Sequence, residues 1–418
     1  MRVVMYSPDS IGLGHMRRNA MIASEIVRQK PAASVALLIG SGAGAFFSVP
    51  RGIDTIKLPS VQKVATEKWE SRSLNLSAHE TLTVRAGLIR DVVRGFKPDL
   101  LVVDHLPRGV GGDLVPALQM IEDLAMPTLT VLGLRDIIDD PDVIRARWSE
   151  QGQYEFIDRY FNHILIYGEA DTFDSASAYD LNRRVGCDIS YVGYVCSGSD
   201  SGRQTRGIDV PPSELDGLAS WRSGEKIIVV AGGGGHDAFP MLSLAIEALT
   251  RMDGRKDFRA VVVGGPLMPD EKRTQLATRV QRLSRTRFLS WTADCMDYMA
   301  KADVAVVMAG YNSSLEALST RANVVMIPRA GPSAEQRMRA GMLARRGLLS
   351  CIEPEDASTD LIFAAIQRAL ESPPREPHAA FLNGAATAAG RLIAICEAPQ
   401  PKHPVVSGHT EASRYVVF

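Results

Sequence analysis

Three glycine-containing turns, each directly after a short apolar segment, are the features of this chain best suited to binding an anion. They span residues 10–15, 232–236 and 309–314. Glycines at a turn between a strand and a helix let backbone N–H groups approach an anion at the positive end of the helix. Because such turns occur in both halves of the chain, they predict that a phosphorylated ligand is held in a cleft between two domains.

The third turn carries the most detailed chemistry. Asn312 or Ser313 is expected to cap the helix that follows, so that the free N–H groups of residues 312–315 point toward a pyrophosphate. Glu316 comes one turn later, where its carboxylate could accept hydrogen bonds from ribose hydroxyls. The same residues would also make an ordinary helix start, since Glu is favourable near the positive end of a helix.

Titratable residues are placed at the same ends of the predicted strands. His15 is expected at the start of the first helix, as a general base, as a donor to a phosphate, or as a cap that contacts only its own turn. Asp104 ends a continuously apolar segment and is a candidate base, a partner that orients His15, or a solvated loop residue. Arg135 and Asp136 follow the next such segment, and they either project into the cleft or form a local ion pair.

Short apolar, β-branched segments alternate with helical stretches along the chain. Several are continuously apolar, which is typical of parallel strands covered by helices on both faces. The alternation predicts an α/β protein with two Rossmann-like, doubly wound parallel-sheet domains that face a cleft. Strands are expected at residues 3–7, 35–39, 55–58, 100–103, 128–132, 164–167, 190–195, 226–231, 259–264, 286–290, 304–308, 324–327 and 350–352. Helices are expected near residues 15–30, 78–95, 112–124, 150–160, 237–250, 269–283, 294–301, 312–320, 333–346, 358–370 and 386–397.

A change in composition divides the chain into domains. Residues 196–224 are rich in Ser, Gly, Asp, Pro and Arg without an apolar period. They are expected to link an N-terminal domain, residues 1–195, to a C-terminal domain, residues 225–385. A terminal helix, residues 386–398, is expected to precede a flexible tail over residues 399–418.

The overall composition restricts partners and location. The net charge of −1 provides no basic excess for binding nucleic acid. The arginine-rich segment 337–346 could contact anionic lipid, but a solvated helix face is the favoured expectation. Five scattered cysteines fit a reducing cytoplasm, and neither a signal peptide nor a membrane-spanning helix is expected. The apolar segment 44–49 is a candidate for peripheral contact with the inner face of a membrane, or for buried helix packing.

Residues 286–346 resemble the C-terminal donor-binding domain of the family that includes the lipid II–forming N-acetylglucosaminyltransferase, whose members have the GT-B fold. The resemblance implies that the turn at Gly310 binds the donor pyrophosphate, that Glu316 binds ribose, and that a Gln-containing pair contacts the donor sugar. It also implies that the segment around Leu289 cups the base and that residues 232–235 form a second donor loop. With the arguments above, the predicted donor-binding residues are Gly233, Gly234, Gly235, His236, Leu289, Trp291, Gly310, Asn312, Ser313, Ser314, Glu316, Glu335 and Gln336.

The first glycine turn departs from the acceptor loop of the lipid II enzymes. It is more similar to the G-x-G-H-x-x-R motif of the UDP-sugar hydrolases of pseudaminic acid synthesis, in which the matching His is thought to activate water. A nucleotide-sugar hydrolase is therefore an alternative. A nonhydrolysing nucleotide-sugar epimerase, by shared fold only, and a nucleotide-sugar sensor are others. The predicted acceptor-side residues are Gly12, Gly14, Arg17, Arg135 and Asp136.

The favoured prediction is a glycosyltransferase that moves a sugar from a nucleotide-diphosphate sugar, UDP-linked, to an acceptor hydroxyl. His15 or Asp104 would remove the acceptor proton. No Asp-x-Asp motif ends a strand, and Asp139 and Asp140 are adjacent acids in an Asp-Pro turn, so a metal-independent reaction without a cofactor is expected. Backbone N–H groups and His236 would stabilise the leaving diphosphate. The acceptor is left open between a small molecule, a glycan and a lipid-linked molecule.

Overall fold

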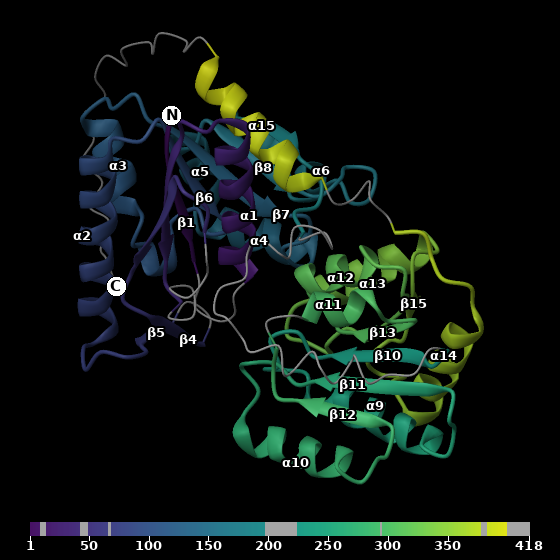
Figure 1. The fold of residues 1–418 in the computed structure, drawn as a ribbon. Coiled ribbons are helices and arrows are strands. Elements are labelled where there is room, and N and C mark those ends of the chain that lie inside the picture. Colours follow the sequence, from purple (N-terminus) through teal and green to yellow (C-terminus); the bar gives the residue numbers. More distant parts are fainter. Residues whose placement is uncertain are drawn as a thin grey trace.

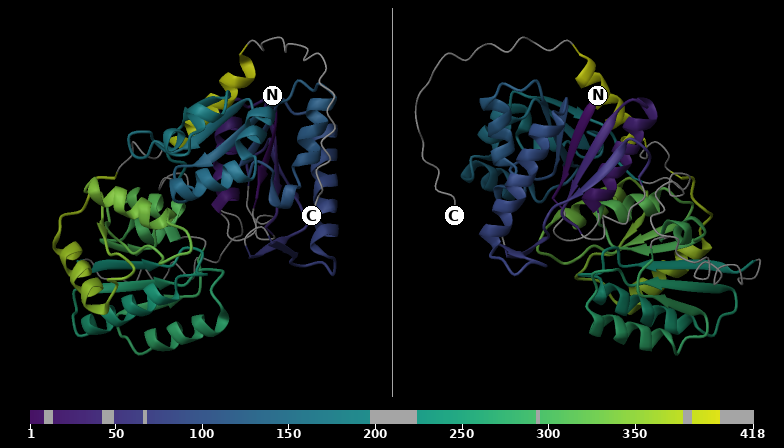
Figure 2. Two further views of the ribbon diagram at one scale, coloured as in Figure 1. Left: turned by 180° about the vertical axis from the view of Figure 1, so that it is seen from behind. Right: turned by 60° about the vertical axis from the view of Figure 1, so that its left-hand side comes forward.

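The chain forms two α/β lobes, each built on its own sheet (Figures 1 and 2). The computed structural model describes residues 1–8, 14–41, 49–65, 68–196, 224–292, 295–377 and 383–398. In both large sheets every described strand pairing is parallel. The predicted fold class of two facing, doubly wound α/β domains is therefore confirmed.

The N-terminal sheet has seven strands in the order β3-β2-β1-β6-β7-β8-β9. Its strands are apolar on both faces because helices cover both faces. In β1, Val3 and Met5 pack beneath one helical layer, whereas Val4 and Tyr6 pack beneath the other. The strands are β1 (Arg2–Ser7), β2 (Ser34–Ile39), β3 (Ile53–Lys57), β6 (Leu100–Asp104), β7 (Leu129–Arg135), β8 (His163–Tyr167) and β9 (Asp188–Tyr191).

Two helical layers sandwich this sheet. One layer contains α1 (Gly14–Gln29) and α15 (Gly384–Glu397). The other contains α2 (Ala78–Phe96), α3 (Val115–Asp123), α4 (Pro141–Glu150) and α5 (Gln153–Tyr160). Shorter elements complete the domain: the antiparallel pair β4 (Val61–Ala65) and β5 (Lys68–Ser71), the 3₁₀ turn η2 (Val110–Gly112), α6 (Ser175–Ala178) and α7 (Leu181–Arg184).

The C-terminal sheet has six strands in the order β12-β11-β10-β13-β14-β15. These are β10 (Lys226–Ala231), β11 (Phe258–Val263), β12 (Thr286–Leu289), β13 (Val304–Val307), β14 (Asn323–Met326) and β15 (Ser350–Cys351). On one face lie α9 (Phe239–Met252), α10 (Asp270–Val280) and α14 (Thr359–Glu371). On the other lie α11 (Cys295–Ala300), α12 (Tyr311–Leu318) and α13 (Glu335–Arg345).

The last helix, α15, leaves the C-terminal lobe and packs on α1 in the N-terminal lobe (Figure 1). The chain re-enters this lobe through a close backbone approach. The Gly384 N–H donates to the Tyr194 carbonyl at 3.2 Å, and a Cβ at Gly384 would lie 2.5 Å from that residue's backbone. Only glycine fits this crossing without displacement of the chain.

All thirteen predicted strands and all eleven predicted helices have counterparts. The sequence prediction missed β4, β5, α4, α6 and α7. The interpretation of the Asp-Pro pair as a turn was incomplete, because Asp140 is the N-cap of α4 and accepts from the Asp142 N–H at 2.9 Å, with Pro141 in the first helical turn.

Several predicted segments lie outside the described residues: most of the linker 196–224, residues 44–48 of the candidate membrane segment, and the tail 399–418. Within the described part of the chain, none of the helices combines the length and apolarity needed to cross a bilayer.

Candidate active site between the two domains

The two sheets meet through the carboxyl ends of their strands. In each sheet the strand order reverses between two central neighbours, β1 and β6 in one lobe and β10 and β13 in the other. Ligands of open parallel sheets bind beyond the strand ends at such reversal points. Here both points face the same region between the lobes, called the cleft below, because residues after β1 and at the end of β7 contact residues that follow β13 and β14.

The described parts of the three glycine turns converge in this cleft. A methyl group at Gly14 would lie 3.1 Å from Asn312 Nδ2, across the domain boundary. A methyl group at Gly233, whose φ is +59°, would lie 2.9 Å from Ser313 Oγ. Gly12 lies outside the described residues. A side chain at either glycine would therefore displace a polar side chain of α12, and the left-handed backbone at Gly233 favours glycine in addition.

His15 lies in the first turn of α1 and is held by the buried carboxylate at the end of β6. Its Nδ1 lies 2.9 Å from Asp104 Oδ2. Arg18 Nη2 donates to both Asp104 oxygens, at 3.0 and 2.8 Å, and also lies 3.0 Å from His15 Nδ1. Asp104 is fully buried, so it is not the solvated loop residue that the sequence left open. Since the carboxylate is acceptor-only, it favours a proton on Nδ1 and leaves Nε2 as the basic nitrogen.

Burial and neighbouring charges shift the pKa values of His15 and Asp104 in opposite directions. Burial lowers the pKa of His15, and this effect exceeds the opposing attraction of the Asp104 carboxylate. Burial alone would raise the pKa of Asp104, but the Arg18 guanidinium and His15 outweigh it and lower that pKa. The geometry therefore combines a neutral imidazole with an ionised carboxylate near neutral pH.

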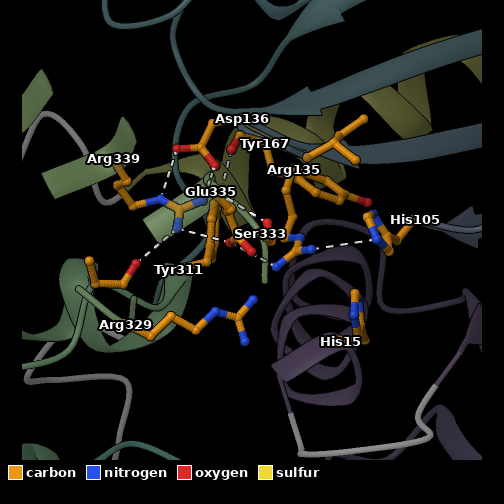
Figure 3. A network of polar contacts seen from close by, with 12 residues as sticks. His15, His105, Arg135, Asp136, Tyr167, Tyr311, Arg329, Ser333, Glu335 and Arg339 are labelled. Carbon is orange, nitrogen blue, oxygen red and sulfur yellow. Dashed lines mark hydrogen bonds and ion pairs between the residues drawn. The ribbon is translucent and has the colours of Figure 1, made fainter. Parts of the chain in front are cut away.

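A second histidine lies beside the first. The His105 ring stacks on His15, with centroids 5.3 Å apart and planes 25° from parallel. His105 has a φ of +69°, which turns the chain directly after β6. Arg135 Nη2 lies 3.4 Å from His105 Nε2, and Figure 3 shows this arginine between the histidine and Glu335.

Three buried charges and the partly exposed Arg135 connect the lobes in an alternating network (Figure 3). Arg135 and Arg339 each donate to Glu335 Oε1 at 2.9 Å, and Arg339 also donates to Asp136 at 2.7 and 3.2 Å. Arg135 and Asp136 therefore do not form the local ion pair considered from the sequence. Both instead pair with residues of the other domain. Burial lowers the pKa of Arg339, but Asp136 and Glu335 outweigh it and raise that pKa above its ordinary value.

Glu316 also forms an ion pair across the cleft. Arg17 Nη2 lies 2.7 Å from Glu316 Oε1, and the Glu316 side chain is only 8% exposed. The attraction of Glu316 raises the pKa of Arg17. The helix that carries Glu316 begins at Tyr311 with Gly310 as its N-cap and no side-chain cap. The expected capping by Asn312 or Ser313 is therefore wrong, because both lie within the first turn of α12.

The remaining predicted donor residues differ in their access to the cleft. Trp291 and His236 are exposed, at 52% and 65%, whereas Leu289 is 6% exposed and belongs to the apolar core. Gln336 Oε1 accepts from the Arg329 N–H at 3.2 Å. Ser314 is buried in α12 beside Met326. Gly235 has a φ of +90°, and Gly234 lies between the two glycines with positive φ.

The sequence prediction missed the residues that connect these groups. Arg18 is sandwiched between Tyr167 and Tyr311, whose ring centroids lie 4.8 and 5.2 Å from its guanidinium carbon. The Tyr311 hydroxyl donates to the Tyr167 carbonyl and accepts from the Val195 N–H, both at 3.0 Å. Arg339 is 2% exposed, so the prediction of a solvated face for residues 337–346 is wrong at this position. Its spacing of four residues from Glu335 was the available signal.

Within the described ranges, no group of three or more His, Cys, Asp or Glu side chains is arranged to hold a metal ion. Asp139 and Asp140 are engaged elsewhere. Asp139 accepts from the Ala334 N–H of the other lobe at 2.8 Å, and Asp140 caps α4. Metal independence stays a prediction.

Residues 227–392 match the family model of the glycosyltransferase family 28 C-terminal domain. The C-terminal lobe thus resembles a glycosyltransferase domain of this type, and the resemblance inferred from the sequence is confirmed. A comparison with curated protein sequences gives no significant match.

Solved structures share the whole two-lobe architecture. A UGT of Medicago truncatula complexed with UDP-glucose has a TM-score of 0.60 and 13% identity, over 94% of this chain and 98% of that chain. A UGT of Phytolacca americana complexed with UDP-2fluoro-glucose and pterostilbene has a TM-score of 0.60 and 16% identity, over 95% and 100%. A Listeria monocytogenes protein, assigned only provisionally as a UDP-N-acetylglucosamine 2-epimerase, has a TM-score of 0.60 and 13% identity, over 96% and 98%. These similarities establish the GT-B fold, and the chemistry has to be argued from the site.

Proposed function

We propose that this protein transfers a sugar from a UDP-linked donor to an acceptor hydroxyl, without a metal ion or cofactor. The nucleotide would bind to the C-terminal lobe and the acceptor to the N-terminal lobe. The type of the C-terminal domain supports a nucleotide-sugar donor, and the UDP-sugar complexes of two fold relatives support uridine as its base.

One observation carries the proposal: the His15–Asp104 pair at the reversal point of one sheet faces the Gly310 turn at the reversal point of the other. In this arrangement Nε2 of His15 takes the proton of the acceptor hydroxyl. The acceptor oxygen then attacks the anomeric carbon as the bond from that carbon to the diphosphate oxygen breaks. Asp104 stabilises the imidazolium that forms, since it is an ionised carboxylate in contact with Nδ1.

The departing UDP needs stabilisation of its negative charge. The first turn of α12 offers free backbone N–H groups, and no acidic side chain lies in that turn. The glycine turn after β10 lies against Ser313 in the same region. Arg17 is a cation within reach of α12, as its contact with Glu316 shows. These groups support metal-independent departure.

Thermal unfolding with UDP, dTDP, GDP, ADP and CMP, each with and without magnesium, tests the donor site. UDP at 100 times its dissociation constant should add about 2.7 kcal/mol to the free energy of unfolding. We expect a selective shift with UDP that does not depend on magnesium. Equal or absent shifts with all five nucleotides would contradict the donor-site proposal.

The reaction class is tested by UDP release from a panel of UDP-sugars, with and without a mixture of hydroxyl acceptors. Acceptor-dependent UDP release with a new glycoside is the expected result. Rapid release with free sugar and no acceptor would instead identify a hydrolase, and interconversion of the UDP-sugar without release an epimerase.

Glu316→Ala should weaken UDP binding by about 1–3 kcal/mol, because the ribose hydroxyls lose a charged acceptor. Isothermal titration with UDP measures this change. Glu247→Ala is a matched control, since Glu247 lies on the outer helix α9 and is 56% exposed. Unchanged UDP affinity in Glu316→Ala would remove Glu316 from the donor site.

We also propose a cytoplasmic location, with peripheral contact at the inner face of a membrane if the acceptor is lipid-linked. The five cysteines are all free thiols, which supports a reducing compartment.

A further inference from the structure

The carboxylate proposed to bind ribose already has a partner in the protein. Arg17 of the N-terminal lobe reaches across the cleft and lies 2.7 Å from Glu316 Oε1. The Glu316 side chain is almost completely buried, whereas Arg17 is about one-third exposed. A ribose hydroxyl that donates to Glu316 therefore competes with a guanidinium for the same carboxylate.

Arg17 is also near the place where a diphosphate would bind. It lies in the first turn of α1, which begins at Gly14, and Gly14 approaches the Asn312 side chain in the first turn of α12. The starts of two helices from different lobes thus come together beside Arg17. Neither helix has an acidic residue in its first turn. Partial positive charge from both helix starts favours an anion there.

We propose that Arg17 is an exchange residue: it holds Glu316 while the cleft is empty, and it moves to the donor diphosphate when ribose takes Glu316. This inference rests on the proposed function. It assigns Arg17, predicted from the sequence only as an acceptor-side residue, to recognition of the donor. Because Arg17 and Glu316 belong to different lobes, the exchange replaces a direct contact between the lobes by a contact through the donor.

The exchange predicts a difference between the affinities of the protein for uridine and for UDP. Uridine has ribose but no phosphate. It must displace Arg17 from Glu316, and it provides no anionic group to which the displaced guanidinium can donate. UDP displaces Arg17 in the same way and then supplies two phosphates that accept from it. The contact therefore weakens the binding of the nucleoside and increases the advantage of the diphosphate.

The test compares the affinities of uridine and UDP for the wild type and for Arg17→Ala. Isothermal titration measures UDP binding directly and uridine binding by competition with UDP. We expect uridine to bind about fivefold or more tightly to Arg17→Ala, the lower end of typical coupling between sites. We expect the advantage of UDP over uridine to fall by at least about tenfold, as for loss of one charged hydrogen bond. Arg17→Lys should retain part of that advantage.

Two controls separate exchange from a general effect of the arginine. Arg28→Ala removes the same charge from the last turn of the same helix, where Arg28 pairs with Glu25, and it should change neither affinity. In a Glu316→Ala background, Arg17→Ala should no longer tighten uridine binding, because the Glu316 carboxylate that Arg17 occupies is absent.

The outcomes are distinct. If the wild type binds none of the nucleoside diphosphates, the proposed function fails. If the wild type binds UDP but Arg17→Ala leaves uridine affinity unchanged or weaker, the exchange is wrong while the donor site stands. Equal changes in uridine and UDP affinity would show that Arg17 acts only on the structure of the cleft, and would also overturn the exchange.

Discussion

Among the described residues, the two hydrogen-bonding partners of His15 lie at the same nitrogen of its ring. Asp104 and Arg18 lie at Nδ1, so the proposed base is Nε2. His15→Ala should lower kcat by about 10²- to 10⁴-fold, the usual contribution of a general base, with little change in UDP affinity. The measurement is kcat with saturating donor beside a UDP titration. His79→Ala is the control, since His79 is exposed on α2. A loss of UDP affinity with unchanged kcat would make His15 a phosphate ligand instead.

The same residue sets the acidic side of the pH profile. A base works only when it is unprotonated, and burial lowers the pKa of His15 from its ordinary value of 6.5. Activity should therefore persist below pH 6.5 and fall only as the pH drops through the lowered pKa of His15. The profile of kcat/KM against pH tests this. An acidic limb above pH 6.5 would contradict the direction of the shift.

The sequence predicted which residues lie at the strand ends of the site better than it predicted the residues with which they form ion pairs. His15, Asp104 and Arg135 could be placed because each follows an apolar segment, and carboxyl ends of parallel strands share one edge. Arg339 could not, because nothing in a helical sequence shows that an arginine faces a carboxylate some 200 positions away in the chain. Leu289 was chosen as an apolar wall, yet the strand pattern that predicted β12 equally places it in the core.

At the scale of elements, the glycine turn after β10 is constrained by the positive φ of Gly233 and Gly235. Gly233→Ala should cost about 1–2 kcal/mol of stability from its left-handed backbone, and it should also weaken UDP binding because the new methyl group displaces Ser313. Gly112→Ala is the matched control, since Gly112 also has a positive φ, of +83°, but has open space around its Cβ position. Urea unfolding and UDP titration of both variants make the test. Equal UDP affinities for the two variants would show that only backbone strain matters.

Helices and strands could be predicted from the sequence where the spacing of apolar residues and the capping residues indicated the same element. They were missed where these two signals were absent or in conflict. The parallel strands carry continuous apolar segments, so their positions followed directly. The pair β4 and β5 is short and polar and lies outside both large sheets, so it has no such signal. Helix α4 begins at an Asp-Pro pair that suits a turn as well as a helix start, and only Ile144 and Trp148 of this helix are buried.

At the scale of the whole molecule, the largely buried network of Asp136, Arg339, Glu335 and Arg135 connects the two lobes. Arg339→Met should destabilise the protein by about 3–5 kcal/mol, since it leaves Asp136 buried without its cation. Urea unfolding measures the change. Arg251→Met, which removes an exposed ion pair with Asp360 inside one lobe, should cost less than about 1 kcal/mol. Similar costs for the two variants would mean that the network does not hold the lobes together.

The return of α15 to the N-terminal lobe determines the connectivity of the chain. The main chain leaves that lobe after Tyr194 and comes back at Gly384, where the two crossings touch. The N-terminal lobe is therefore discontinuous in sequence, and the donor lobe is inserted into it as a cassette with adjacent ends. Exchange of this cassette for the equivalent part of a relative should change which nucleotide sugar is used, while α15 continues to support α1 and the base that it carries.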